Sequence, residues 1–86
     1  MQNQNMEASF STLIMSLGSS TIMSLGLAQN PQTGKTEIDL NIAKFNIDLL
    51  LMLQDKTKNN LNEDEEKFLK ALVTDLQMKY VEAKKA

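Results

Sequence analysis

The chain has 86 residues, enough for one small domain, and a formal net charge of −2 at pH 7. Cysteine and histidine are absent and all nine basic residues are lysine, which excludes disulfides and catalytic or metal sites built on thiolate or imidazole. The slight acidity gives no electrostatic reason to expect nucleic acid or an anionic membrane surface as a partner. We therefore predict a protein that is not an enzyme and uses no cofactor or metal.

The chain is predicted to form a single helical domain over residues 7–83. Residues 1–6 are expected to be a disordered polar tail, and residues 84–86 a frayed end. The N-terminal segment has neither the basic region of a signal peptide nor a lipidation motif, so a cytoplasmic location is expected.

The first predicted helix spans residues 7–27, within a stretch from Ala8 to Gly34 that carries no charged side chain. At 100° per residue, apolar side chains gather on one face and hydroxyl side chains on the other. The apolar face holds Phe10, Ile14, Leu17, Ile22 and Leu25; the hydroxyl face holds Ser9, Thr12, Ser16, Ser19, Ser20 and Ser24, with Leu13 and Met23 among them. Small hydroxyl residues three and four positions apart let helix backbones approach closely, so this face favours contact with another helix. The alternative is an ordinary solvated polar face.

The second predicted helix spans residues 40–58 and is capped by Asp39. A tight turn is expected before it at residues 29–34, which contain an Asn-Pro pair and a glycine. Apolar residues cover nearly the whole circumference of this helix, and the polar strip consists of Asn41, Lys44, Asp48 and Asp55. Two neighbouring helices cannot bury that many sides, so we expect further protein to cover this helix.

The third predicted helix spans residues 63–83. Asn59 or Asn60 is expected to take the left-handed conformation that ends the second helix, and Asn62 and Glu65 have the spacing of a capping box. One apolar stripe is expected on it, made of Phe68, Leu69, Leu72, Val73, Leu76 and Tyr80. The acidic residues of its first turn are interpreted as compensation of the helix dipole, not as a cation site.

Two copies of the hydroxyl-rich face of the first helix, related by a two-fold axis, would be self-complementary. A homo-oligomer, a dimer or larger, is therefore predicted. The residues predicted to form the self-association or partner interface are Phe10, Leu13, Ser16, Leu17, Ser20, Ser24, Phe45, Leu49, Met52 and Leu53.

The main alternative is a small protein anchored to a membrane through residues 8–28, since the uncharged run is long enough to span a bilayer. Eight of the sixteen residues from Ser9 to Ser24 are Ser or Thr, and no basic cluster or aromatic belt marks either end, which argues against it. A nucleic-acid binder ranks third, and its only candidate contacts are Lys56, Lys58, Lys79, Lys84 and Lys85.

The order of motifs along the chain closely resembles DUF1844, a family of small bacterial proteins of unknown function. The motifs that carry the resemblance are Phe10-x-x-Leu13-Ile14-x-Ser16-Leu17, Leu25-Gly26-Leu27, Asn30-Pro31-x-Thr33-Gly34, Ala43-Lys44-x-x-Ile47-Asp48-Leu49-Leu50-x-Met52-Leu53, Lys56-Thr57-Lys58-x-Asn60-Leu61, Glu65-Glu66-Lys67-x-Leu69 and Asp75-Leu76-x-Met78-x-Tyr80-Val81. They cover roughly residues 8–82. The chain departs from the family where Asn59 replaces a common glycine, and where Gln77 and Lys79 stand in place of arginine. The resemblance implies a short α-helical protein and transfers no catalytic or binding residue.

Together these features predict an all-α, three-helix chain whose helical hairpins pack into a homo-oligomeric bundle. The expected function is that of a non-catalytic, self-associating scaffold, adaptor or assembly subunit in the bacterial cytoplasm, with an unknown protein as a further candidate partner.

Overall fold

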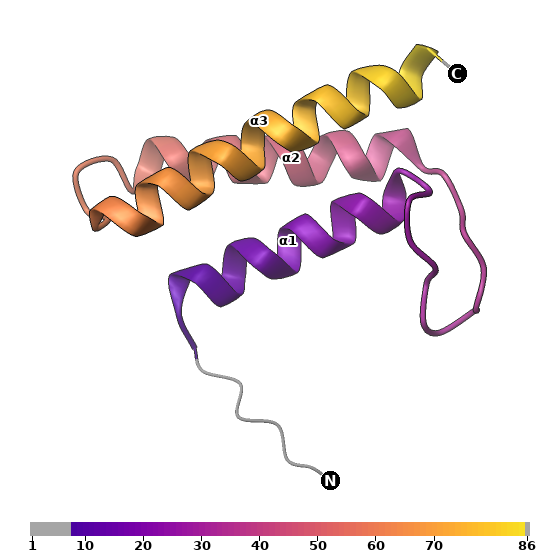
Figure 1. Ribbon diagram of the computed structural model, residues 1–86, viewed down its shortest axis with the longest axis horizontal. Helices are drawn as coiled ribbons and strands as arrows, with labels where there is room; N and C mark the ends of the chain where they lie inside the picture. The colour runs from indigo at the N-terminus through magenta and orange to yellow at the C-terminus, as the bar shows by residue number, and fades with distance from the viewer. Residues whose placement is uncertain (1–7, 86) are drawn as a thin grey trace, which may run out of the picture.

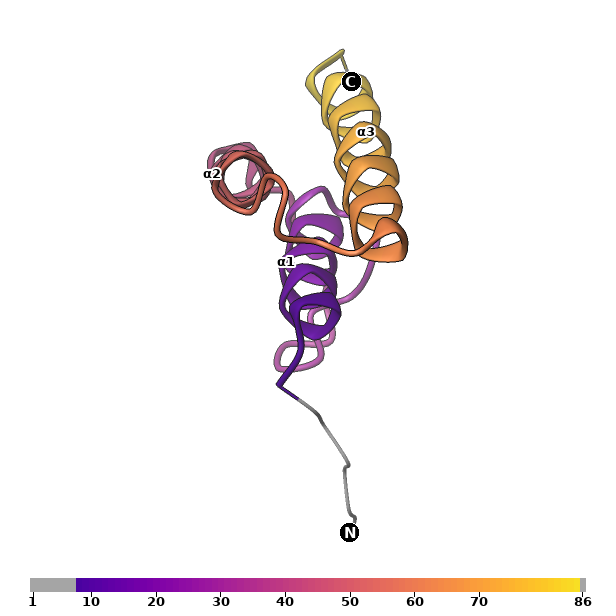
Figure 2. The same cartoon turned by 90° about the vertical axis from the view of Figure 1, so that its left-hand side faces the viewer.

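The protein is an all-α chain of three helices, seen here in a computed structural model that describes residues 8–85 (Figure 1). The helices are α1 (Phe10–Ser24), α2 (Leu40–Lys56) and α3 (Glu63–Lys85). Helix α2 runs antiparallel to both α1 and α3 (Figure 1). Viewed along the helices, α2 and α3 stand on either side of α1 (Figure 2). The prediction of an all-α chain whose three helices pack against one another is confirmed. The predicted tail at residues 1–6 lies outside the described residues.

Helix α1 is shorter than predicted because its capping residues lie inside the predicted range. The Ser9 hydroxyl accepts a hydrogen bond from the Thr12 backbone N–H at 3.1 Å, which fixes the start of the helix at Phe10. After Ser24 the chain turns away through Gly26, whose φ of +77° lies in the left-handed region.

A long connection returns the chain from α1 to α2, and backbone contacts close it at its base. The Asp39 N–H donates to the Ser24 carbonyl at 2.8 Å, and Leu25 pairs with Ile38 in an isolated antiparallel bridge. The predicted turn at residues 29–34 is present, with the Gly34 N–H donating to the Asn30 carbonyl at 2.7 Å. Because both ends of the connection are fastened together, α2 must start beside the end of α1 and run back along it.

The predicted caps of α2 and α3 are confirmed. The Asp39 carboxylate accepts from the Ile42 N–H at 3.1 Å, and Asn59 takes the left-handed conformation at φ 69° after α2. Asn62 and Glu65 form the capping box, with each side chain accepting from the other residue's backbone N–H at 2.8 and 3.0 Å. Helix α2 ends at Lys56, two residues before the predicted end, while α3 continues to Lys85.

A small apolar core lies where the three helices meet. Its buried members come from all three helices: Ile14, Ile47, Leu50, Leu69, Val73 and Leu76. Partly buried side chains pack around them, namely Phe10, Leu17, Ile22, Leu53, Leu61, Leu72 and Tyr80. The apolar faces predicted for α1 and α3 therefore point inward.

Replacing Gly26 by alanine is expected to lower the free energy of unfolding by about 2 kcal/mol. A side chain at positive φ costs about 1–2 kcal/mol, and a Cβ at this position would lie 2.6 Å from Cγ1 of Ile38. Cγ1 is attached directly to the branched Cβ of Ile38, so Ile38 must change its rotamer or the backbone must shift, and the contact adds to the loss. Urea unfolding followed by circular dichroism measures the change.

Gly34→Ala is the matched control, because Gly34 has a φ of +71° and open space where a Cβ would stand. It is expected to cost about 1 kcal/mol, the backbone contribution alone. Equal losses for the two variants would show that the close approach to Ile38 carries no energy.

Candidate functional site

The hydroxyl-rich side of α1 is in part a contact surface within the chain. The Asn46 side-chain amide on α2 donates to the Ser20 hydroxyl on α1 at 2.9 Å. Asn46 is only 6% exposed, so this bond satisfies a buried polar group. Helix α3 approaches α1 closely at Gly18, where an added Cβ would lie 3.3 Å from the Leu72 methyl carbons. The close helix packing expected from small residues thus occurs between the chain's own helices.

The ten residues predicted to form an interface divide into an inward and an outward group. Phe10, Leu17 and Leu53 pack against the chain's own core. Ser20 accepts from Asn46, and the Ser24 hydroxyl donates to the Ser20 carbonyl at 2.9 Å. The other five remain available to a partner: Leu13, Ser16, Phe45 and Met52 are exposed, and Leu49 is half-buried. For this outward group, contact with a partner stays a prediction.

The outward residues of α2 form one line along the helix. Ile42, Phe45, Leu49 and Met52 follow one another at spacings of three, four and three residues, which places them on one face. We call these four residues the outer stripe. The buried residues Ala43, Ile47 and Leu50 lie on the inner side of the same helix. Helix α2 is therefore apolar both toward the core and toward the outside, as its sequence predicts.

One edge of the outer stripe is charged. Lys44 and Asp48 form an ion pair at 2.9 Å on this edge, and both side chains are exposed. The Asp48 carboxylate raises the pKa of Lys44 above its usual value, first through their hydrogen bond and then through charge attraction. Asn41 and Asp55 are exposed on the same edge, so the predicted polar strip is confirmed.

The other edge of the outer stripe lies toward α1. The Ser20–Asn46 hydrogen bond identifies the side of α2 that faces α1. Leu13 is seven residues before Ser20 and so lies on the same face of α1, two turns away. Because the helices are antiparallel, Leu13 points to the end of α2 that holds Met52. Its exposed side chain therefore extends the apolar surface from α2 onto α1.

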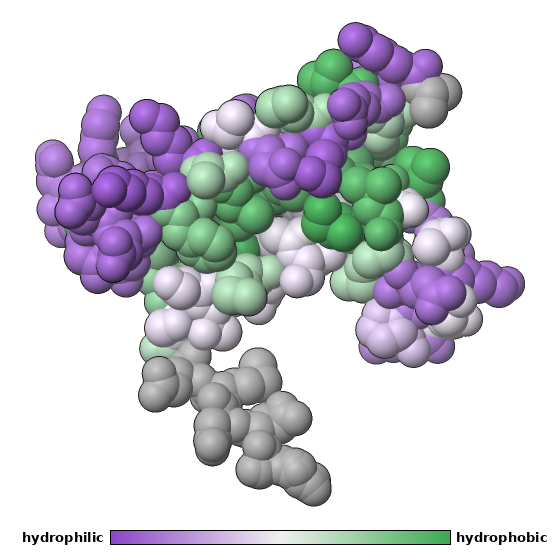
Figure 3. Space-filling view, viewed as in Figure 1, coloured by the Kyte–Doolittle hydropathy of each residue, from purple (hydrophilic) through white to green (hydrophobic). Residues whose placement is uncertain are grey.

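A second apolar region lies between α1 and α3. It is a groove of about 570 Å³, lined mainly by apolar side chains, among them Met15, Ile22, Met23, Phe68 and Leu72. Apolar side chains are seen gathered between the two helices on this face (Figure 3). Phe68 was predicted to lie in the apolar stripe of the third helix, but its side chain is 38% exposed and lines this groove.

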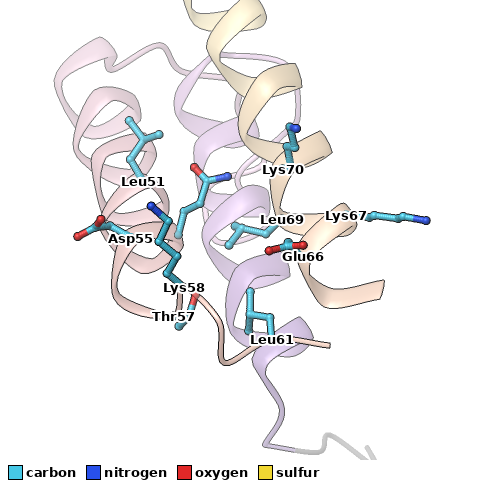
Figure 4. Close-up of a pocket in the computed structure, with 10 residues that line it drawn as sticks. Leu51, Asp55, Thr57, Lys58, Leu61, Glu66, Lys67, Leu69 and Lys70 are labelled. Atoms are coloured by element: carbon cyan, nitrogen blue, oxygen red, sulfur yellow. The ribbon is translucent and has the colours of Figure 1, made fainter. Parts of the chain in front are cut away.

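A more polar cleft of about 580 Å³ lies between the end of α2 and the start of α3 (Figure 4). Glu66 points into the space between the helices, Lys58 runs back across the end of α2, and Asp55 and Lys67 point away from each other (Figure 4). The charged side chains that line this cleft are exposed and include both acidic and basic groups. The cleft therefore presents no concentrated charge of one sign to a ligand. Across residues 8–85, no group of three or more acidic side chains is arranged to hold a metal ion.

The longest uncharged stretch of the sequence forms a helix of only 15 residues. None of the helices formed by the described residues has the length and apolar character needed to cross a bilayer.

Two residues that are important for the packing, Asn46 and Gly18, were not predicted from the sequence. Asn46 lies on the side of α2 that also carries Ala43 and Leu50, and a polar residue on an apolar side is the signal that could have marked it. Gly18 is one of the small residues of α1, and its specific neighbour, Leu72, depends on how α1 and α3 cross.

These features define the protein as a small three-helix domain with an exposed apolar face on α2. A scan of protein-family models matches residues 7–82 to the domain of unknown function DUF1844. The match covers most of the chain, and the protein belongs to the DUF1844 family, as its motifs indicate. No curated protein and no solved structure matches the chain.

Proposed function

We propose that this protein is a non-catalytic subunit that associates with itself and serves as a small scaffold or adaptor in the bacterial cytoplasm. The observation that carries the proposal is the exposure of the outer stripe. Phe45 is 61% exposed and Ile42 is 47% exposed, on the outward face of a helix that is already buried on its inner side. Single exposed apolar residues are ordinary, but a continuous line of them marks an interaction surface.

The polar groups of the chain support a non-catalytic role. Histidine and cysteine are absent, and the remaining candidates for acid–base chemistry are carboxylates, lysines and Tyr80. Lys44 with Asp48 and Lys79 with Asp75 form exposed pairs one turn apart on their helices. Such pairs are typical of a solvated helix surface.

Self-association predicts a molar mass of about twice the chain's 9.7 kDa. The experiment is light scattering coupled to size-exclusion chromatography on untagged protein, without detergent, over a hundredfold range of concentration. A dimer or larger species that dissociates only on dilution would support the proposal. A monomer throughout would contradict it, as would recovery only in detergent, which would favour the membrane-anchored alternative.

A further inference from the structure

The spacing within the outer stripe is that of a helix that pairs with another helix. Ile42, Phe45, Leu49 and Met52 repeat the alternating intervals of three and four that place apolar residues along the contact line of a coiled coil. Helix α2 contributes four such positions in its 17 residues. The surface therefore fits the side of another α-helix better than a flat or globular surface.

The two edges of the stripe differ, and this difference selects the orientation of the partner helix. One edge carries Lys44, Asp48 and Asp55; the other lies against α1. A two-fold axis perpendicular to two antiparallel helices brings each edge against the same edge of the other copy. A two-fold axis along two parallel helices would instead set the charged edge of one copy against the α1 side of the other.

Antiparallel pairing also matches the charges. With the axis between Phe45 and Leu49, Phe45 of one copy faces Leu49 of the other, and Ile42 faces Met52. Lys44 of each copy then lies close to Asp48 of its partner, about 3 Å apart along the helix axis at 1.5 Å per residue. The two Asp48 carboxylates also lie about 3 Å apart along the axis, and the two Lys44 ammonium groups flank them, so the four groups form a cluster without net charge at the two-fold axis.

We propose that a second copy of this chain occupies the outer stripe, with the two α2 helices packed antiparallel about a two-fold axis between Phe45 and Leu49. This pairing rests on the self-association proposed above and adds its location and orientation. The interface is isologous, and each contact across the axis therefore occurs twice. Both α1 helices lie on the same side of the α2 pair, where Leu13 of each copy extends the apolar contact.

Phe45→Glu is the test of location. It places a carboxylate at the centre of the stripe in both copies, and we expect the dissociation constant to rise about a hundredfold or more, as for a central interface residue. Because Phe45 is exposed in the single chain, the helical circular dichroism should be unchanged. The matched control is Met78→Glu, at an equally exposed apolar residue on α3, which should leave the dissociation constant unchanged.

The outcomes separate the two proposals. A wild-type dimer that survives Phe45→Glu would overturn the α2 pairing and leave self-association standing. A wild-type monomer would overturn both and assign the stripe to a different protein. Loss of the dimer in both variants would show a general charge effect and would also overturn the assignment to α2.

Cysteine cross-linking tests the orientation, because the natural chain has no cysteine. Asn41→Cys and Asp55→Cys lie at opposite ends of the charged edge and leave Lys44 and Asp48 intact. In the antiparallel pair, each of these positions lies near the other one on the partner, whereas identical positions are roughly 20 Å apart along the helix axis. A short bismaleimide should therefore link a mixture of the two variants and should link neither variant alone. Links between identical positions, or a dimer that gives no link, would overturn the antiparallel arrangement.

Discussion

Replacing Leu50 by alanine is expected to lower the free energy of unfolding by about 3–4 kcal/mol. Leu50 is fully buried in the core cluster, and truncating a buried leucine costs about 2–5 kcal/mol because a cavity adds to the lost burial. Domains of this size are stable by only about 5–10 kcal/mol, so a large share of the stability would disappear. Urea unfolding followed by circular dichroism measures the effect, at several protein concentrations because self-association adds stability.

Leu51→Ala is the control, since it makes the same chemical change on the next residue of α2. Leu51 is 37% exposed at the cleft between α2 and α3, and its truncation is expected to cost about 1 kcal/mol or less. The contrast tests the orientation of α2 relative to the core. Similar losses for the two variants would contradict it.

The helix ends could be predicted where the signal is local. Asp39, Asn59, Asn62 and Glu65 act on backbone groups within a few residues of themselves, so their identity and spacing are sufficient. The end of α1 was predicted three residues too late. The signal for this end was nevertheless local: Gly26 takes a positive φ just after the helix, its N–H donates to the Met23 carbonyl at 3.0 Å, and the Leu27 N–H donates to the Ile22 carbonyl at 3.1 Å. The prediction carried the helix past this glycine stop signal.

The candidate surface could be predicted only in part, because periodicity identifies the faces of a helix but not their neighbours. Ser20 was expected to meet a partner and instead accepts from Asn46 of the same chain. Leu53 was expected on the outside and packs against the core. Which side of α1 meets α2 depends on how the long connection returns, and no pattern within either helix encodes that.

The apolar excess of α2 shows what composition can predict. A helix that is apolar almost all round must be covered on more than one side, and the three-helix fold covers its inner side alone. The outer stripe is the part left over. The spacing of the outer stripe, its charged edge and its continuity with Leu13 define a specific contact surface. This surface can be recognised only once the position of α1 and the Lys44–Asp48 ion pair are known.

Replacing Asn46 by aspartate is expected to lower the free energy of unfolding by about 2–4 kcal/mol at pH 7. The substitution removes the amide that donates to Ser20 and puts a negative charge at a position that is 6% exposed. No cationic side chain is hydrogen-bonded to Asn46 in the described part of the chain, so the charge would be buried without compensation. Unfolding by urea at pH 7 and at pH 4 measures both the loss and its dependence on pH.

The sign of the pH dependence follows from burial. Burial raises the pKa of the new carboxyl in the folded protein above its unfolded value of about 3.9. Below that value the group is neutral in both states and the loss nearly vanishes; the loss grows as pH rises and is complete above the folded-state pKa. Asn41→Asp is the matched control, because it adds the same charge at an exposed position in the first turn of α2, where the helix dipole favours it. It should change the stability at pH 7 by no more than about 0.5 kcal/mol. A loss at Asn46 that is the same at both pH values would show that the missing hydrogen bond, and not the buried charge, destabilises the contact between α1 and α2.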